Sequence, residues 1–271
     1  MKNKIFAIDE NDKSKVIKYV KALKKRNRHT DDIFAIKIGL KTLLDNGLSI
    51  IKKIKKISDL DIICDLKLAE IPSLSGEIAA RVYSLGADGI IVQGFVGEKV
   101  IDQIYEKAPG LKIYVVSEMT HNDGGFTSKH LEDFANMAKR KQVFGIIGPG
   151  NRPDNLQKIK DIVQSEVKVI AAGIGAQGGE EANVIRHGAD YLIEGSKIRK
   201  ELEGQINQQL KRFSIEVALY FASGVILGIV FLFVTNYLKI ITNPPYVNIW
   251  GPITFGIISS TIRIFIVKNN E

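Results

Sequence analysis

Charged residues of both signs follow two expected strands in a pattern that favours catalysis. In the segment ICDLKLAEIP, Asp65 and Lys67 are two residues apart on a strand, and Glu70 follows at the turn after it. Side chains two apart on a strand point to the same face. The run AIKIG places Lys37 at a comparable height on an earlier strand. Two lysines and two carboxylates are therefore expected to meet in one small site.

A network of ion pairs with a purely structural role would show the same residues, and such networks also perturb pKa values. Buried charge clusters are poor sources of net stability, however, because the cost of desolvation offsets the attraction. Of the two interpretations, the spacing favours a catalytic site.

The elements that must position these residues alternate between short apolar runs and amphipathic stretches over residues 1–212. Strands are expected at Ile5–Asp9, Phe34–Gly39, Ile62–Lys67, Gly89–Gly94, Ile113–Met119, Val143–Gly148, Val169–Gly173 and Tyr191–Gly195. Helices are expected at Lys13–Lys25, Leu43–Ile57, Gly76–Leu85, Val100–Ala108, His130–Lys141, Asn155–Gln164, Glu180–His187 and Lys197–Phe213. Eight strand and helix pairs predict an α/β fold, a (β/α)8 TIM barrel, with a doubly wound sheet as the alternative.

Polar residues gather where a barrel of this kind places its active site. Catalytic groups in such barrels come from the carboxyl ends of the strands and the loops that follow them. The residues at these positions are Asp9, Lys37, Asp65, Lys67, Glu118, Gln177 and Ser196. Since the strand interiors stay apolar, the polar residues predict a functional site at that end of the barrel.

Residues 213–271 form a second predicted domain, a membrane anchor. The chain runs without a charge from Val217 to Val234, which is long enough to cross a bilayer as a helix, and the span is expected at about 215–238. A second span is expected at about 246–267, after a turn that contains Pro244 and Pro245. The alternative is a pair of buried helices in a soluble domain.

The distribution of positive charge predicts the orientation of this anchor. Lys211, Arg212, Arg263 and Lys268 would lie on one side of the membrane and Lys239 on the other. The positive-inside rule then places the barrel and the C-terminus in the cytoplasm of a multi-pass membrane protein.

The overall composition limits the other classes of function. A net charge of +8 fits anionic, phosphate-bearing substrates or an anionic membrane surface, whereas the lysines lack the aromatic interleaving expected for nucleic-acid binding. The one cysteine, Cys64, excludes an intrachain disulfide and favours a reducing compartment. The histidines lack ligand spacing, so no metal site is expected.

The barrel region resembles the archaeal branch of the orotidine 5'-phosphate decarboxylase family over residues 4 to about 210. The matching segments are FAID, AIKIG, DLKLAEIP, GADGIIVQGF, VVSEMTH, IGPGNRPDNL and GIGAQGG. The combination of D-x-K with G-A-Q-G-G is more specific than either motif alone. The resemblance implies conversion of orotidine 5'-phosphate to uridine 5'-phosphate and carbon dioxide, a step of de novo pyrimidine biosynthesis, without a cofactor.

The same resemblance implies roles for individual residues. Lys67 would donate a proton to C6 of the pyrimidine as carbon dioxide leaves, with Asp65 beside the leaving carboxylate. Lys37 and Asp9 would contact the ribose hydroxyls. In the family the second acid of the motif enters the site of the neighbouring subunit, so Glu70 implies a homodimer with shared active sites.

Another set of residues would bind the remainder of the substrate. Thr120 would face the pyrimidine edge, and Gln177 would reach toward the phosphate near Gly178. Backbone amides of glycine-rich loops suit an anion, and so does a helix N-terminus such as the one expected at Gly195, Ser196 and Lys197.

Three positions depart from the family pattern. Glu70 stands where the family has Asp, and Leu74 stands where it has a Thr that contacts the ribose. Ser196 takes the place of an arginine that clamps the phosphate. These differences predict weaker phosphate binding. They also leave two alternatives open: a sugar-phosphate aldolase or decarboxylase on the same barrel, or a catalytically impaired, membrane-anchored binding protein.

Overall fold

Eight parallel strands close into a barrel in the order of the sequence. A computed structural model describes residues 2–121, 125–175 and 177–242. The strands are β1 (Lys4–Ile8), β2 (Ile33–Gly39), β3 (Asp61–Leu68), β4 (Gly89–Gln93), β5 (Lys112–Val116), β6 (Gly145–Pro149), β7 (Lys168–Ala172) and β8 (Tyr191–Glu194). The register closes through β1 and β8, where Ile5 pairs with Ile193. The predicted TIM barrel is confirmed, and each expected strand is present within a few residues of its predicted bounds.

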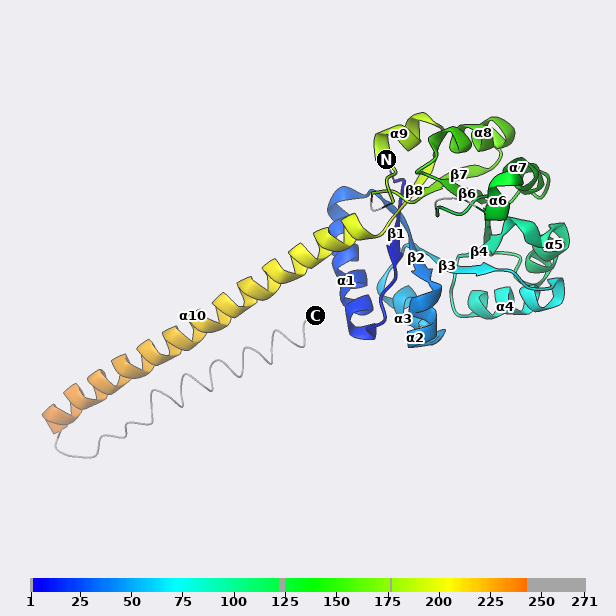
Figure 1. The fold of residues 1–271 in the computed structure, drawn as a ribbon. Helices are drawn as coiled ribbons and strands as arrows, with labels where there is room; N and C mark the ends of the chain where they lie inside the picture. The colour runs from blue at the N-terminus through cyan, green and yellow to red at the C-terminus, as the bar shows by residue number, and fades with distance from the viewer. Residues whose placement is uncertain (1, 122–124, 176, 243–271) are drawn as a thin grey trace. The chain divides into compact units, whose positions relative to one another are not determined.

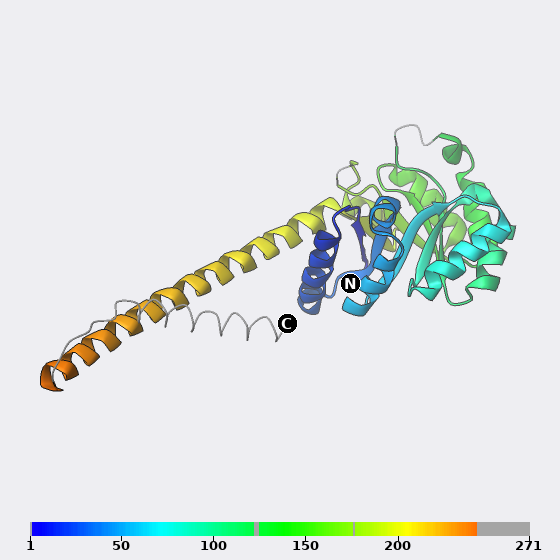
Figure 2. The same ribbon diagram turned by 90° about the horizontal axis from the view of Figure 1, so that it is seen from below.

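Helices follow the strands, and α1 to α9 surround the barrel (Figures 1 and 2). They are α1 (Lys13–Thr30), α2 (Leu40–Asn46), α3 (Ser49–Ile57), α4 (Pro72–Ser84), α5 (Glu98–Lys107), α6 (Gly125–Lys129), α7 (Leu131–Arg140), α8 (Pro153–Val163), α9 (Glu181–Arg186) and α10 (Ser196–Thr242), with a 3-10 turn η1 (Gly94–Val96). The single helix predicted at 43–57 is wrong, because Gly47 has a φ of 70° and separates α2 from α3.

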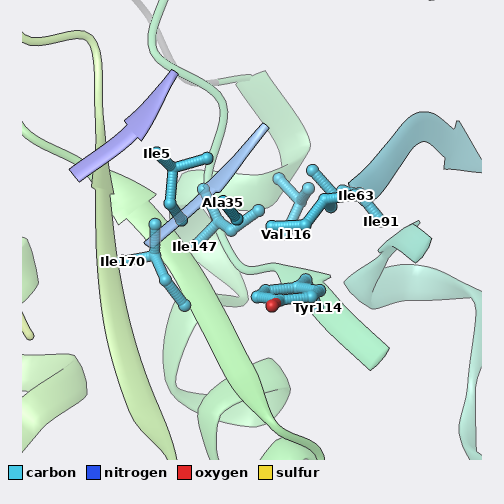
Figure 3. Close-up of a cluster of buried hydrophobic side chains, with 8 residues drawn as sticks. All are labelled: Ile5, Ala35, Ile63, Ile91, Tyr114, Val116, Ile147 and Ile170. Atoms are coloured by element: carbon cyan, nitrogen blue, oxygen red, sulfur yellow. The ribbon is translucent and has the colours of Figure 1, made fainter. Parts of the chain in front are cut away.

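Large side chains fill the interior of the barrel. Ile5, Ala35, Ile63, Ile91, Tyr114, Val116, Ile147 and Ile170 come from β1 to β7 and meet inside it (Figure 3). Each of them is at most 5 % exposed. The barrel is thus a packed core rather than a pore, as is usual for this architecture, and a ligand must bind at its mouth.

The helix α10 continues through the predicted domain boundary at residue 212. It runs without interruption from Ser196 to Thr242, while the compact units of the chain are residues 1–203 and 204–271. Within its portion from Ser196 to Val234, the most apolar 18-residue stretch is only 11 % buried, which is unlike the core helix of a soluble domain. By length and composition α10 is a candidate membrane span. The second span predicted at 246–267 lies outside the described residues.

Candidate active site

Three charged side chains converge at the carboxyl ends of β2 and β3. Lys37 Nζ lies 2.6 Å from Asp65 Oδ2, and Lys67 Nζ lies 3.0 Å from both carboxylate oxygens of Asp65. The side chains of Lys37 and Asp65 are 8 % and 5 % exposed, whereas that of Lys67 is 42 % exposed. The carboxylate thus holds one buried ammonium group and a second that opens to solvent, where a substrate has access to it.

A β-bulge brings Lys67 to this position. Cys64 pairs with Ile90 and Leu68 pairs with Val92, so β3 uses four residues where β4 uses two. Lys67 has a φ of 42°, a left-handed conformation that costs energy for any residue with a Cβ. The predicted approach of Lys67 to Asp65 is therefore seen, but strand alternation was the wrong reason for it. Backbone strain at a charged, half-exposed lysine is typical of functional sites.

The two ammonium groups determine the ionisation of Asp65. Burial by itself acts to raise the pKa of this carboxyl, but the charges and hydrogen bonds of Lys37 and Lys67 outweigh it and lower the pKa. Asp65 is therefore a carboxylate at neutral pH and can carry a negative charge next to a bound anion.

The carboxylate of Asp9 packs against the end of β2. A Cβ placed on Gly39 would lie 1.8 Å from Asp9 Oδ1, so only glycine at this position leaves room for the carboxylate. Asp9 itself is exposed just after β1. The sequence contained Gly39 within the AIKIG segment but provided no sign of this role.

Glu70 does not join the cluster within this chain. Its side chain is exposed, and Oε2 accepts a hydrogen bond from the backbone of Ile71, 3.1 Å away. In the described part of the chain, no ion pair links Glu70 with Lys37 or Lys67. Of the four predicted catalytic residues, the structure brings three together.

Thr120 and Gln177 meet at the end of β7. A Cβ on Gly173 would lie 2.8 Å from Gln177 Oε1 and 3.2 Å from Thr120 Cγ2, and Gly173 has a φ of 81°. Glycine is required there by both the conformation and the close approach. The loops after β5 and β7 thus bring two predicted substrate-binding residues together, and Gly178 follows in the second loop.

A buried ion pair supports the loop that carries Thr120. Glu118 is 1 % exposed, and its carboxylate lies 2.9 Å from Arg152 Nε and accepts a hydrogen bond from Asn155 at 2.7 Å. The guanidinium of Arg152 also donates to the backbone carbonyls of Met119 and, at 3.1 Å, His121. Sequence reasoning placed Glu118 at a strand end but did not find this network, because Arg152 is more than thirty residues away along the chain.

A cavity of about 160 Å³ lies at the ends of β7 and β8. The predicted residues Gly195, Ser196 and Lys197 line it, together with Ile174, Gly175, Gly179, Glu181 and Glu194. Its walls include backbone around a helix N-terminus, which suits an anion. The two glutamates were not predicted, since neither lies in a segment that the motifs cover.

Comparison with known proteins identifies the family of this barrel. Residues 2–205 match the orotidine 5'-phosphate decarboxylase / HUMPS family. The chain belongs to this family. Orotidine 5'-phosphate decarboxylase from Methanococcoides burtonii is 38 % identical over 197 residues, which are 72 % of this chain and 88 % of the relative. The enzyme of the same name from Pyrococcus furiosus is 33 % identical over 216 residues, or 78 % of this chain and 98 % of that protein.

Solved structures of this family have the same barrel. A crystal structure of orotidine 5'-monophosphate decarboxylase from Methanocaldococcus jannaschii, complexed with the inhibitor BMP, is 33 % identical. It covers 75 % of this chain and 98 % of its own, with a TM-score of 0.66. The family match ends at residue 205, so most of α10 lies beyond the part of the chain that these relatives share.

Proposed function

We propose that this protein is an orotidine 5'-phosphate decarboxylase, a carbon-carbon lyase that releases carbon dioxide from orotidine 5'-phosphate and forms uridine 5'-phosphate. The prediction of this activity is confirmed by the relatives, which carry that name consistently. The observation in the structure that supports it most is the ammonium group of Lys67, held 3.0 Å from the buried carboxylate of Asp65 with one side open to solvent.

The arrangement suits a reaction in which negative charge develops on a ring carbon. When the bond between C6 and the carboxylate breaks, the electron pair stays on C6 and carbon dioxide leaves. Lys67 then donates a proton to C6 and regains one from solvent. Its positive charge also stabilises the carbanion in the transition state. The fixed negative charge of Asp65 lies where the substrate carboxylate would approach, so loss of that carboxylate relieves repulsion.

The remaining predicted residues would orient the substrate. Lys37, whose ammonium is bound to Asp65 at 2.6 Å, and Asp9 would contact the ribose hydroxyls. Thr120 would face the pyrimidine edge. Gln177 lies next to Thr120 across Gly173, and this proximity supports a role for Gln177 in reaching from the ring toward the phosphate. Binding energy from these remote groups would position C6 against Lys67.

The phosphate would bind at the cavity after β7 and β8. Gly195, Ser196 and Lys197 line this cavity, and Gly178 lies in the loop beside it. Backbone amides at the start of α10 and the ammonium of Lys197 would replace the arginine that the family uses there.

A homodimer would complete the site. Large apolar side chains are exposed in the segments that follow β2 to β5, and they are Leu40, Leu44, Ile71, Leu74, Phe95 and Phe126. Exposed apolar patches of this kind mark protein interfaces. Glu70 is exposed and directly precedes Ile71, so association through these side chains would bring its carboxylate to the partner's site. A sedimentation measurement on Leu44→Glu, which should favour the monomer, tests this arrangement.

The region after the barrel would tether the enzyme to a membrane. The apolar part of α10 and the second apolar stretch at about 246–267 would form two spans, with the barrel and the C-terminus in the cytoplasm. Residues 1–212 and 213–271 would then be the catalytic domain and the anchor. Labelling of cysteines introduced one at a time at Asn243, between the proposed spans, and at Asn269, after the second, from either side of sealed vesicles, distinguishes two spans from one.

The decisive experiment is an absorbance assay of orotidine 5'-phosphate decarboxylation by the full chain in detergent. Wild-type protein should consume the substrate, and Lys67→Ala should not. Lys52→Ala, which removes an exposed lysine on α3, provides the matched control and should retain activity. Failure of the wild-type protein to form uridine 5'-phosphate would reject the proposed function.

The alternative activity is that of a sugar-phosphate aldolase or decarboxylase on the same barrel, and the matched family is named for HUMPS as well as for orotidine 5'-phosphate decarboxylase. An aldolase or decarboxylase of this kind would use a magnesium ion to stabilise an enediolate. Loss of activity on treatment with EDTA, and its recovery with magnesium, would favour that chemistry. The binding-protein alternative predicts that neither orotidine 5'-phosphate nor uridine 5'-phosphate raises the melting temperature, and that the substrate is not consumed.

A further inference from the structure

The cavity at the ends of β7 and β8 contains two carboxylates where the proposed substrate would place its phosphate. Glu181 and Glu194 both line it, beside Ser196 and Lys197. Glu194 is 3 % exposed, and its Oε2 atom has no hydrogen-bond partner among the described residues. Since a phosphate monoester is a dianion near neutral pH, the two carboxylates oppose its entry.

Two lysines, Lys197 in the lining of the cavity and Lys4 beside these acids, are already paired with them. Lys197 Nζ lies 3.5 Å from Glu181 Oε2. Lys4 Nζ lies 3.3 Å from Glu181 Oε1 and 3.8 Å from Glu194 Oε2. The neighbouring charges of Glu194 and Glu181 raise the pKa of Lys197, as expected for an ammonium group that carboxylates stabilise. Lys4 Nζ also lies 4.0 Å from Asp32 Oδ2, so the acids at least balance the two lysines and the site presents little net positive charge to an incoming anion.

We propose that Glu181 and Glu194 set the phosphate affinity of this site, because phosphate must displace a carboxylate before Lys197 can bind it. This inference rests on the proposed function and extends it. Neither glutamate touches the reacting atoms, so both act as specificity-determining residues. Neutralising either one removes repulsion and leaves Lys197 available for phosphate. The phosphate group therefore contributes less binding free energy at this site than it would at a site whose cations are unpaired.

The contribution of phosphate is measured by comparing two substrates of the full chain in detergent. The ratio of kcat/KM for orotidine 5'-phosphate to kcat/KM for orotidine isolates the effect of the phosphate. Glu181→Gln should raise this ratio about tenfold, mainly through a lower KM, because Lys197 is released from its pair with Glu181 and can bind the dianion. Glu194→Gln should act in the same direction. Glu180→Gln is the matched control, since Glu180 is exposed and does not line the cavity, and it should leave the ratio unchanged.

A second background tests the mechanism. In Lys197→Met, the ammonium that Glu181 is proposed to sequester is absent, so Glu181→Gln should produce a much smaller rise than in wild type. An equal rise in both backgrounds, or an unchanged or lower ratio for Glu181→Gln in wild type, overturns the proposal. If Glu194→Gln fails to fold, the result for Glu181→Gln is sufficient by itself. The Glu181 side chain is 35 % exposed, so its substitution should not prevent folding.

The inference can fail independently of the proposed function. If wild-type protein consumes neither substrate, the decarboxylase assignment fails. Titration calorimetry with inorganic phosphate then tests the inference without any need for turnover. Tighter binding to Glu181→Gln than to wild type supports it, and equal or weaker binding overturns it.

Discussion

Replacing Asp65 by asparagine tests whether the charge cluster is held together as the structure indicates. The substitution keeps the shape of the side chain but removes the counter-ion of Lys37, whose side chain is 8 % exposed. Breaking a buried ion pair by removing one partner costs about 3 to 5 kcal/mol. The asparagine oxygen still accepts one hydrogen bond, so we expect a loss of about 3 kcal/mol, at the lower end of that range.

This loss is large enough for a thermal melt. For a domain of about 200 residues, a loss of this size lowers Tm by roughly 6 to 12 °C. Circular dichroism of the detergent-solubilised chain measures this change. Asp59→Asn is the control, because Asp59 is 94 % exposed and lies 3.6 Å from Lys24 in a surface pair. The control should change stability by less than about 0.5 kcal/mol. A Tm for Asp65→Asn equal to that of the control would refute the reasoning.

The pH dependence of thermal stability provides a second test of the cluster formed by Lys37, Asp65 and Lys67. The pKa of Asp65 is lowered in the folded protein from a reference value of 3.8. The stability that its charge contributes is therefore present above about pH 4 and is lost as pH falls through the folded-state pKa. The difference in Tm between wild type and Asp65→Asn should be constant from pH 5 to pH 7 and should shrink in more acidic solution.

Other substitutions separate structural from catalytic roles. Lys67→Gly should lower decarboxylation about a thousandfold or more, and it should be more stable than Lys67→Ala by up to about 1 kcal/mol. Both variants lack the ammonium group that pairs with Asp65, but only glycine adopts the positive φ of this residue freely, so equal Tm values for the two would contradict the strain argument. Gly39→Ala should leave Tm nearly unchanged but lower kcat/KM about tenfold, since its Cβ displaces the Asp9 carboxylate; unaltered kinetics would show that Asp9 does not bind substrate. Arg152→Met should lower stability by about 3 kcal/mol in a denaturant titration, because it leaves the buried Glu118 without its cation, and an unchanged midpoint would count against the network.

The repeating pattern of the chain was sufficient to predict the barrel. Alternation of apolar runs and amphipathic stretches identified each strand within a few residues, since burial on both faces requires continuous apolar segments. The error at 43–57 arose because an amphipathic pattern continues across Gly47, whose φ of 70° ends one helix before the next begins. A periodic pattern records which face is buried and does not show where the backbone turns.

The motifs likewise predicted which residues would converge, since carboxyl ends of neighbouring strands meet at one mouth. They identified Lys37, Asp65 and Lys67, and these three do meet. They did not reveal the bulge that brings Lys67 to Asp65, because a bulge depends on the register between β3 and β4.

The fold class, the family and the main charged residues of the site follow from the order of residues alone, because they depend on local periodicity and on motifs that are contiguous in the chain. The pairing of the charges follows from the folded barrel. Lys197 is bound to Glu181, and Glu118 to Arg152, across 16 and 34 residues of sequence. Ion pairs of this kind form between loops that the closed barrel brings together, and the strength of each pair depends on burial, which no local pattern specifies.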